Sequence, residues 1–321
     1  MLVAKVYGDS DKGLVRTNNE DAFIAQKVWD DSHWLLVVVD GLGGYEGGEV
    51  AATIAQETIL QTVKEMKGED CLDAIIQSVT DANNAIFNQR SSEEGLSDMG
   101  CVVTAAILDL EKKQLNVAHV GDTRLYQLDG NGLIKLTHDH SFVGALEDEG
   151  SISEEDAMNH PRRNLIDRIV GDDLKETESP KFIEGAVFPV AKGNQYLLCS
   201  DGLSDMLSSV EINSVLQKGV NVKKKVNQLI EAANKNGGKD NVTVIVASID
   251  SEQIKRNIKG NNLPVQVGKK KNKQNKQKKH NYKQSIDLNN ESTDSIFKIG
   301  FITMIILLVV LVVVLLIQTK L

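Results

Sequence analysis

Short apolar runs that begin or end at an aspartate recur along this sequence. Leu35-Leu36-Val37-Val38-Val39, for example, ends at Asp40. Runs of this length, rich in Val, Ile and Leu and bounded by Gly, Asp or Asn, are typical of β-strands. Four aspartates stand at such boundaries, spread over 220 residues: Asp21, Asp40, Asp201 and Asp240. We expect folding to gather these carboxylates at one edge of a sheet, where their mutual repulsion requires a counter-charge.

The apolar patterns predict an α+β architecture in layers. Helical periodicity is clearest over 49–66. Adjacent strand-like runs are close enough in sequence to pair antiparallel, and Gly121-Asp122-Thr123 is expected to be the turn of a hairpin. Strands are predicted at 35–39, 102–108, 114–120, 124–128, 195–199 and 242–249, and helices at 49–66, 70–90, 139–149 and 223–235.

Charge divides the chain into two unlike parts. Residues 1–254 carry 23 Lys and Arg against 42 Asp and Glu, whereas residues 255–321 carry 13 against 3. So acidic a first part argues against nucleic-acid binding, which needs Lys and Arg to meet phosphates, and favours divalent cations. The three cysteines, Cys71, Cys101 and Cys199, are scattered and lack CxxC spacing, as expected for reduced core residues of a cytosolic domain.

The C-terminal residues predict a membrane anchor. Residues 299–317 contain no charge and are mostly Ile, Leu and Val, and about 20 apolar residues span a bilayer. Seven lysines lie within Lys269–Lys279, and lysine-rich flanks stay on the cytoplasmic side. The prediction is a domain at 1–250, a Lys/Asn/Gln-rich flexible linker at 251–298, a transmembrane helix at 299–317 and a short non-cytoplasmic tail at 318–321. The N-terminus shows no cleaved secretory signal, so the domain is expected at the cytoplasmic face of the cell membrane, single-pass.

Asp40-Gly41-Leu42-Gly43-Gly44 has two physical interpretations. Glycines allow a tight turn and leave a backbone carbonyl open, and hard divalent cations take such oxygen ligands. An ordinary strand-to-helix turn explains the same residues taken alone. A phosphate-binding P-loop fits poorly, because its lysine and its spacing are missing.

Five segments together resemble the ordered motifs of the metal-dependent protein phosphatase 2C (PP2C, PPM) family of Ser/Thr phosphatases, in its bacterial form. The similarity runs from about Val6 to Ile249. The segments are Arg16-Thr17-Asn18-Asn19-Glu20-Asp21, Val39-Asp40-Gly41-Leu42-Gly43-Gly44, Gly121-Asp122-Thr123-Arg124, Ser200-Asp201-Gly202-Leu203-Ser204-Asp205 and Asp240-Asn241-Val242-Thr243.

The resemblance implies a sandwich of two antiparallel β-sheets flanked by helices, with two Mn²⁺ or Mg²⁺ ions at one end. Glu20 matches the acidic residue that orients a metal-bound water. Arg16 matches the arginine that binds the substrate phosphate, although an ion pair with Asp9 or Asp11 is the alternative from the sequence alone. The residues that match the metal ligands are Asp21, Asp40, Gly41 through its carbonyl, Asp201 and Asp240.

Two departures from the family pattern affect the chemistry. Asp122 and Asp205 match residues that hold a possible third metal in bacterial relatives, with a turn aspartate and a helix cap as the alternatives. Asn164 stands where some of those relatives carry a serine, which puts the affinity of that third metal in doubt. Leu42 replaces a histidine proposed in some eukaryotic members to protonate the leaving group, so water or another group must do so.

The implied activity is hydrolysis of phosphoserine and phosphothreonine on proteins. Two cations activate a bridging water that attacks phosphorus in line, with no covalent enzyme intermediate. The expected partners are phosphorylated proteins, including a bacterial Ser/Thr kinase, and the protein is expected to be monomeric. The alternative from another class is a catalytically silent phosphoprotein-binding scaffold that keeps the fold.

Overall fold

The structure, a computed structural model, describes residues 1–43, 47–92, 96–173 and 182–251. The chain divides into two units, Met1–Arg256 and Asn257–Leu321, and the described residues all belong to the first. Apart from Ser251, the predicted linker, transmembrane helix and tail lie outside the described residues. Within the part that is described, no helix combines the length and the apolar character needed to cross a membrane.

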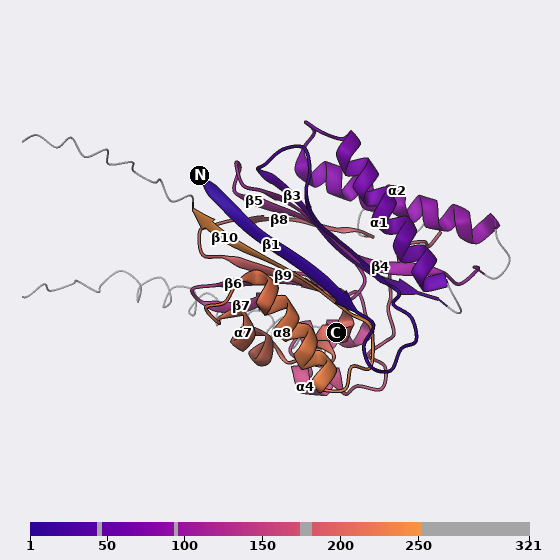
Figure 1. Cartoon of the computed structure of the whole chain (residues 1–321). Coiled ribbons are helices and arrows are strands. Elements are labelled where there is room, and N and C mark those ends of the chain that lie inside the picture. Colours follow the sequence, from indigo (N-terminus) through magenta and orange to yellow (C-terminus); the bar gives the residue numbers. More distant parts are fainter. Residues whose placement is uncertain (44–46, 93–95, 174–181, 252–321) are drawn as a thin grey trace, which may run out of the picture. The chain divides into compact units, whose positions relative to one another are not determined.

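Two five-stranded sheets, antiparallel throughout, form the centre of the fold (Figure 1). This confirms the predicted sandwich. One sheet consists, in spatial order, of β1 (Leu2–Asp11), β10 (Val242–Ser251), β9 (Gln195–Cys199), β6 (Arg124–Asp129) and β7 (Gly132–Lys135). The other consists of β2 (Asp21–Lys27), β3 (His33–Leu42), β4 (Gly100–Asp109), β5 (Gln114–Val120) and β8 (Glu184–Pro189).

Helices cover the outer face of each sheet, which gives four layers (Figure 1). Two long helices pack on the β2–β8 sheet, namely α1 (Gly47–Glu65) and α2 (Cys71–Ser92). The β1–β7 sheet is covered by α6 (Asp201–Ser204), α7 (Ser209–Leu216) and α8 (Val222–Lys235). The connection between β7 and β8 carries α3 (Phe142–Asp148) and α4 (Glu154–Met158).

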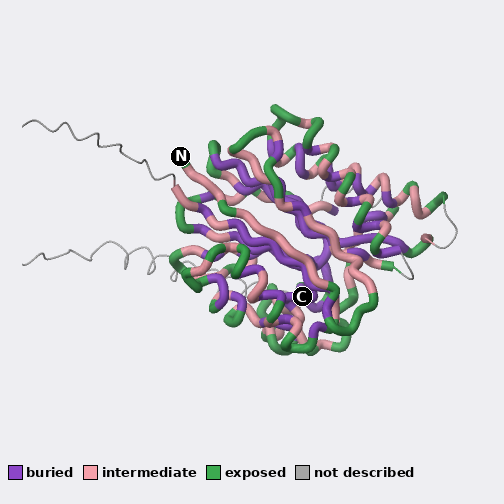
Figure 2. The backbone as a smooth tube through the Cα atoms, in the orientation of Figure 1, coloured by how far each residue is buried: buried purple, intermediate pink, exposed green. Residues whose placement is uncertain are grey.

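Strand β3 shows why its apolar run has no polar alternation. Leu35, Val37 and Val39 pack in the cluster that contains α1 and α2, whereas Leu36 and Val38 pack in the cluster between the two sheets. A strand with both faces covered is apolar at every position, because neither face meets water. Figure 2 shows the resulting burial along the central strands.

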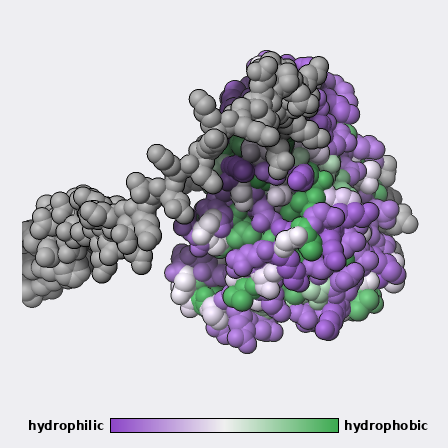
Figure 3. Space-filling model, turned by 60° about the vertical axis from the view of Figure 1, so that its left-hand side comes forward, coloured by the Kyte–Doolittle hydropathy of each residue, from purple (hydrophilic) through white to green (hydrophobic). Residues whose placement is uncertain are grey.

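Some large hydrophobic side chains are exposed among the described residues, such as Leu14, Ile134 and Val210. On the face shown in Figure 3, hydrophilic residues dominate and the hydrophobic ones form small separate patches. Scattered patches of this kind are ordinary for a folded protein and need no partner to cover them.

The predicted hairpin at Gly121-Asp122-Thr123 is wrong. Strands β5 and β6 belong to different sheets, so this segment carries the chain from one sheet to the other. Gly121 has φ of +103°, and a Cβ on it would stand 2.1 Å from Val102 Cγ1. The hydroxyls of Thr123 and Thr104 lie 2.8 Å apart and fasten the crossing to β4. A short Gly-Asp segment fits a hairpin and a crossing equally well, and only the tertiary contacts decide.

Substituting Gly202→Ala is expected to destabilise the junction between β9 and β10. A Cβ on Gly202 would lie 1.9 Å from the Asn241 carbonyl oxygen, so the two segments must separate. We expect the free energy of unfolding, measured by urea denaturation, to fall by about 1–3 kcal/mol. The matched control is Gly219→Ala, where a Cβ meets nothing within 4 Å and a change within about 0.5 kcal/mol is expected. Equal losses in both variants would contradict this account.

Candidate metal centre

Both sheets contribute aspartates to the same end of the sandwich. Asp21 opens β2 and stands opposite Asp40 in the antiparallel register of β2 and β3. From the other sheet, Asp201 begins α6 directly after β9, and Asp240 lies two residues before β10. Strands from both sheets begin or end at this point. Their ends therefore bring together carboxylates that are as far apart in the sequence as residues 21 and 240.

A pocket collects most of the residues predicted from the sequence. It is lined by Arg16, Glu20, Asp40, Gly41, Leu42, Asp122, Asn164, Ile166, Asp201, Asp240 and Asn241. An adjoining pocket shares Asp122 and Asp201 and also contains Asp205. Asp21 lines neither pocket, and its side chain contacts Ser200 and Thr243 of the opposite sheet.

Two hydroxyl groups hold Asp21 in place. Ser200 directly follows β9, and Thr243 lies in β10. Their hydroxyls, Ser200 Oγ and Thr243 Oγ1, both donate to Asp21 Oδ2, at 2.8 and 2.6 Å. The same two residues are bonded to each other, since the Thr243 amide donates to Ser200 Oγ at 3.0 Å. Sequence reasoning gave neither residue a role. Their positions beside Asp201 and Asn241, inside the quoted motifs, were the available signal.

Burial and mutual repulsion shift the protonation of this cluster. Burial, reinforced by the charges of Asp21 and Asp201, raises the pKa of Asp40 well above its usual range. Burial followed by the charge of Asp122 does the same for the pKa of Asp201. The pKa of Asp21 is raised to about 6, because burial outweighs its two hydroxyl hydrogen bonds. Asp21, Asp40 and Asp201 therefore each lie where burial disfavours the charged carboxylate unless a cation compensates.

Two carboxylate oxygens indicate where a cation fits. Asp21 Oδ1 and Asp201 Oδ1 are buried and have no hydrogen-bond partner among the described residues. A buried unpaired oxygen of this kind costs free energy unless a ligand satisfies it. The donor set is made entirely of oxygen, which suits hard divalent cations such as Mg²⁺ and Mn²⁺.

Gly41 is required by close packing. A Cβ at this position would lie 2.1 Å from the Gly48 carbonyl oxygen and 2.6 Å from that of Glu20. Its amide donates to the Glu20 carbonyl at 3.1 Å. The absence of a side chain therefore lets β3, the start of α1 and the Glu20 segment meet beside Asp40.

Arg16 points at the carboxylates rather than at the nearby acidic residues of β1. Its Nη2 lies 2.8 Å from Asp240 Oδ2, and its Nη1 lies 3.7 Å from Glu20 Oε2. The alternative pairing with Asp9 or Asp11 is not what the structure shows. The Arg16 side chain is 46% exposed, so a ligand that enters the pocket can reach its guanidinium.

Asn241 fixes the segment that carries Arg16 and Glu20. Its Oδ1 accepts from the Glu20 amide at 2.8 Å, and its Nδ2 donates to the carbonyls of Lys12 and Asn18 at 3.0 and 2.9 Å. The loop between β1 and β2 is thereby tied to the start of β10. This attachment fixes where Arg16 and Glu20 lie, and it was not predicted from the sequence.

The residues assigned to a third metal lie beside this group. Asp122 is buried, and its pKa is raised to about 7 by burial and then by the charge of Asp139. Asp205 is bound by Arg163, whose Nε donates to its Oδ2 at 2.7 Å. Arg163 was not predicted to take part. Asn164, which lines the same pocket as Asp122, is exposed.

Comparison with known proteins places this geometry in a family. Residues 15–246 match the family model described as protein phosphatase 2C. The chain is 37% identical over 249 residues to the serine/threonine protein phosphatase PstP of Mycobacterium tuberculosis, covering 77% of this chain but only 45% of that protein. It therefore spans less than half of that relative's length.

In two further comparisons, the matched region covers nearly the whole length of the related protein. The serine/threonine phosphatase stp of Listeria welshimeri is 35% identical over 243 residues, which is 74% of this chain and 92% of that protein. The crystal structure of the PstP catalytic domain in complex with two manganese ions superposes with a TM-score of 0.67 at 35% identity, covering 78% of this chain and all of that one. With its sheet order, its strand-end aspartates and this similarity taken together, the chain belongs to the protein phosphatase 2C family.

Proposed function

We propose that this protein removes phosphate from phosphoserine and phosphothreonine residues of proteins in a reaction that depends on Mn²⁺ or Mg²⁺, opposing a Ser/Thr kinase. The observation that carries the proposal is the convergence of carboxylates from both sheets, two of them with unsatisfied buried oxygens, beside the accessible guanidinium of Arg16. The relatives named above are Ser/Thr phosphatases, and the related crystal structure contains two manganese ions.

The carboxylate cluster would hold the cations. The proposed ligands of two ions are Asp21, Asp40, the Gly41 carbonyl, Asp201 and Asp240, and those of a third are Asp122 and Asp205 together with Asp201. Bound divalent cations supply Lewis acidity, lowering the pKa of water and neutralising charge on a phosphoryl group. The third position has a competitor in this chain, because Arg163 already neutralises Asp205.

Arg16 is the proposed phosphate-binding residue. A guanidinium offers two parallel N–H donors, the geometry that phosphate oxygens accept. Its present contacts with Asp240 and Glu20 keep it at the pocket, and an entering phosphate exchanges for those contacts. Glu20, held through its amide by Asn241, has its carboxylate in the same pocket and would orient the attacking water.

The departing serine or threonine oxygen needs a proton. Leu42 lines the pocket and has no proton to give. Protonation is therefore assigned to water that enters the pocket. Co-localisation with phosphoproteins is the proposed main source of substrate choice.

The proposed location is the cytoplasmic face of the cell membrane, with residues 299–317 as a single-pass anchor. The support is in the sequence: 19 uncharged residues follow a lysine-rich stretch that also favours anionic head groups. A long polar linker at 251–298 would let the domain reach phosphoproteins, including a membrane kinase, near the anchor.

Asp40→Asn is expected to lower the Mn²⁺-dependent hydrolysis of p-nitrophenyl phosphate and of a phosphothreonine peptide by about a hundredfold or more, because even residues one shell outside a metal cost about 10–100-fold. EDTA is expected to abolish the activity of the unsubstituted protein. The control is Asp250→Asn at the far end of β10, whose carboxylate is 50% exposed, lies 3.7 Å from Lys5 and accepts from the Ser251 amide at 2.8 Å. Equal rates in all samples would favour the silent scaffold.

The metal-free protein is expected to show a pH-dependent gain from Asp122→Asn. Burial raises the folded-state pKa of Asp122 to about 7 from an ordinary 3.8, so its contribution to stability is complete below 3.8 and is lost as the pH rises through 7. In EDTA, the melting temperature of the variant should therefore exceed that of the unsubstituted protein at pH 8, and the difference should shrink by pH 6. A difference that stays constant would refute the raised pKa.

Removal of residues 296–321 is expected to release the protein from membranes with its activity intact. The reason is that the removed residues contain the whole uncharged stretch and none of the proposed site. Fractionation of cells followed by phosphatase assay measures both properties. Continued sedimentation of the truncated protein with membranes would overturn the anchor.

A further inference from the structure

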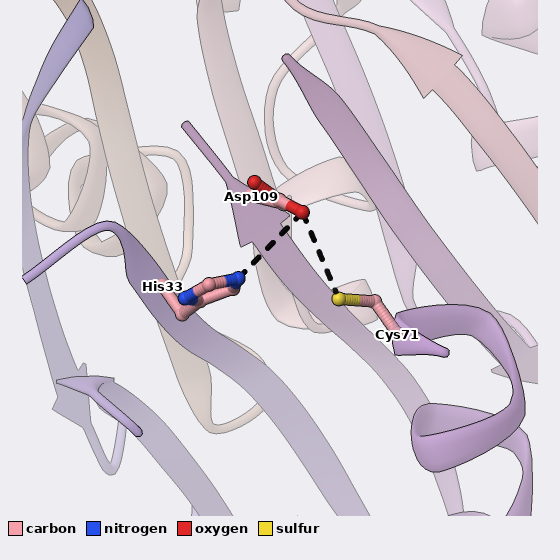
Figure 4. A group of neighbouring side chains, drawn as sticks. All are labelled: His33, Cys71 and Asp109. Atoms are coloured by element: carbon pink, nitrogen blue, oxygen red, sulfur yellow. Dashed lines mark hydrogen bonds and ion pairs between the residues drawn. The ribbon is translucent and has the colours of Figure 1, made fainter. Parts of the chain in front are cut away.

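A second group of metal-ligating side chains lies at the other end of β3, the strand that carries Asp40. His33 is the first residue of β3 and Asp109 the last of β4, and the two stand opposite each other in the antiparallel register. Cys71 is the first residue of α2. One ligand atom from each of the three lies within 4.8 Å of the others (Figure 4).

We propose that His33, Cys71 and Asp109 form a binding site for a divalent cation of borderline softness, of which Zn²⁺ is the natural example, separate from the carboxylate centre. One imidazole nitrogen, one thiolate and one carboxylate oxygen make a mixed donor set that Zn²⁺ accepts and that Mg²⁺ does not. Three protein ligands leave the fourth tetrahedral position to water.

The distances between the ligand atoms are close to those of a coordinated cation, and the His33–Asp109 distance is too long for a strong hydrogen bond. His33 Nε2 lies 3.6 Å from Asp109 Oδ2, and Cys71 Sγ lies 4.0 Å from the same oxygen. A strong N–H···O bond is shorter, at about 2.7–3.2 Å. Zinc bonds of about 2.0–2.3 Å place neighbouring ligands of a tetrahedron about 3.3–3.6 Å apart. Small movements of the side chains therefore complete the geometry.

Surrounding hydrogen bonds already direct the ligand atoms. His33 Nδ1 lies 2.8 Å from Asp30 Oδ1, which assigns the proton to Nδ1 and leaves Nε2 with its lone pair toward Asp109. Asp109 Oδ1 is occupied by the amides of Glu111 and Lys112, at 2.9 and 2.8 Å, so that Oδ2 is the oxygen that faces the site. A carboxylate behind a metal-binding histidine is the usual second layer of a zinc site.

The local backbone holds this arrangement. Trp29 has φ of +64°, unusual for a residue with a side chain, and its indole Nε1 donates to the Val63 carbonyl of α1 at 2.6 Å. Asp30 Oδ1 also accepts from the Ser32 amide at 2.8 Å. The turn that presents His33 is thus fixed at both ends before any cation arrives.

Access and proton balance are both satisfied. Cys71 and Asp109 are buried, whereas the His33 side chain is 14% exposed and provides the route of entry. Burial, reinforced by the charge of Asp109, raises the pKa of the Cys71 thiol to about 11. A cation must displace this thiol proton: as the sulfur–metal bond forms, the proton leaves to solvent, with no change of oxidation state. A bound cation would link the start of α2 to the adjoining ends of β3 and β4.

The test uses Co²⁺ as a spectroscopic probe on the full chain, in excess Mg²⁺ that keeps the oxygen centre occupied. Thiolate ligation gives a sulfur-to-cobalt charge-transfer band, which an all-oxygen centre lacks. We expect one equivalent of Co²⁺ to produce this band and stoichiometric Zn²⁺ to remove it. Cys71→Ser should abolish it, and the matched control Cys101→Ala, which removes another buried cysteine, should keep it.

His33→Gln supplies a second variant at a partly exposed position, and its affinity for Co²⁺ should fall at least tenfold. A far-UV circular dichroism spectrum and a melting temperature close to those of the unsubstituted protein verify the fold of each variant. The proposal is overturned if the unsubstituted protein gives no band, if Cys71→Ser keeps it, or if Cys101→Ala loses it. Because the readout is spectroscopic, it stands independently of whether the phosphatase assignment holds.

Discussion

The hydrogen bonds from Ser200 and Thr243 to Asp21 are the contact on which the active end of the sandwich depends. They join the first residue of β2 in one sheet to the ends of β9 and β10 in the other. Both donate to Oδ2, so Oδ1 stays buried and unpaired. One carboxylate therefore performs two tasks: one oxygen locks the sheets together, and the other creates a local demand for positive charge. That lock, together with the hydrogen bond from the Glu20 amide to Asn241, fixes the spacing between the aspartates of the two sheets.

Strands that are buried on both faces were predicted from the sequence. A strand that is partly exposed to solvent was missed. Leu35–Val39 is apolar at every position because helices cover one side and the opposite sheet covers the other. β1 (Leu2–Asp11) was not predicted, since it lies at a sheet edge and carries Lys5, Asp9 and Ser10 among its apolar residues. The crossing at Gly121 was predicted as a hairpin for a related reason: local turn chemistry does not say which sheet the next strand joins.

The candidate site divides in the same way. The aspartates were found from the sequence because each lies in a short motif with its own signature. Their supports were not found, because Ser200, Asn241 and Arg163 act through contacts that span 42 to 221 residues of sequence. Arg163 matters most, since its bond to Asp205 places a cationic side chain where a third metal was expected. Whether that position accepts a cation therefore depends on a loop residue as much as on the aspartates.

The two proposed metal sites lie at opposite ends of β3. The ligands at one end are all oxygen atoms, and those at the other end are a mixture of nitrogen, sulfur and oxygen. Asp40 and His33 are seven strand residues apart, about 23 Å at the usual rise, and two unit charges at that distance interact by only about 0.7 kcal/mol at an effective dielectric constant of about 20. The two sites therefore do not influence each other's charge appreciably. Zn²⁺ binds most donor sets more tightly than Mn²⁺, so an oxygen-only centre does not exclude it by affinity. A thiolate ligand discriminates between these cations more strongly, because it binds Zn²⁺ well and Mg²⁺ poorly. The proposed ligands at the carboxylate end are all oxygen atoms, which suit hard cations, whereas the mixed donor set at the other end of β3 gives Zn²⁺ a site of its own.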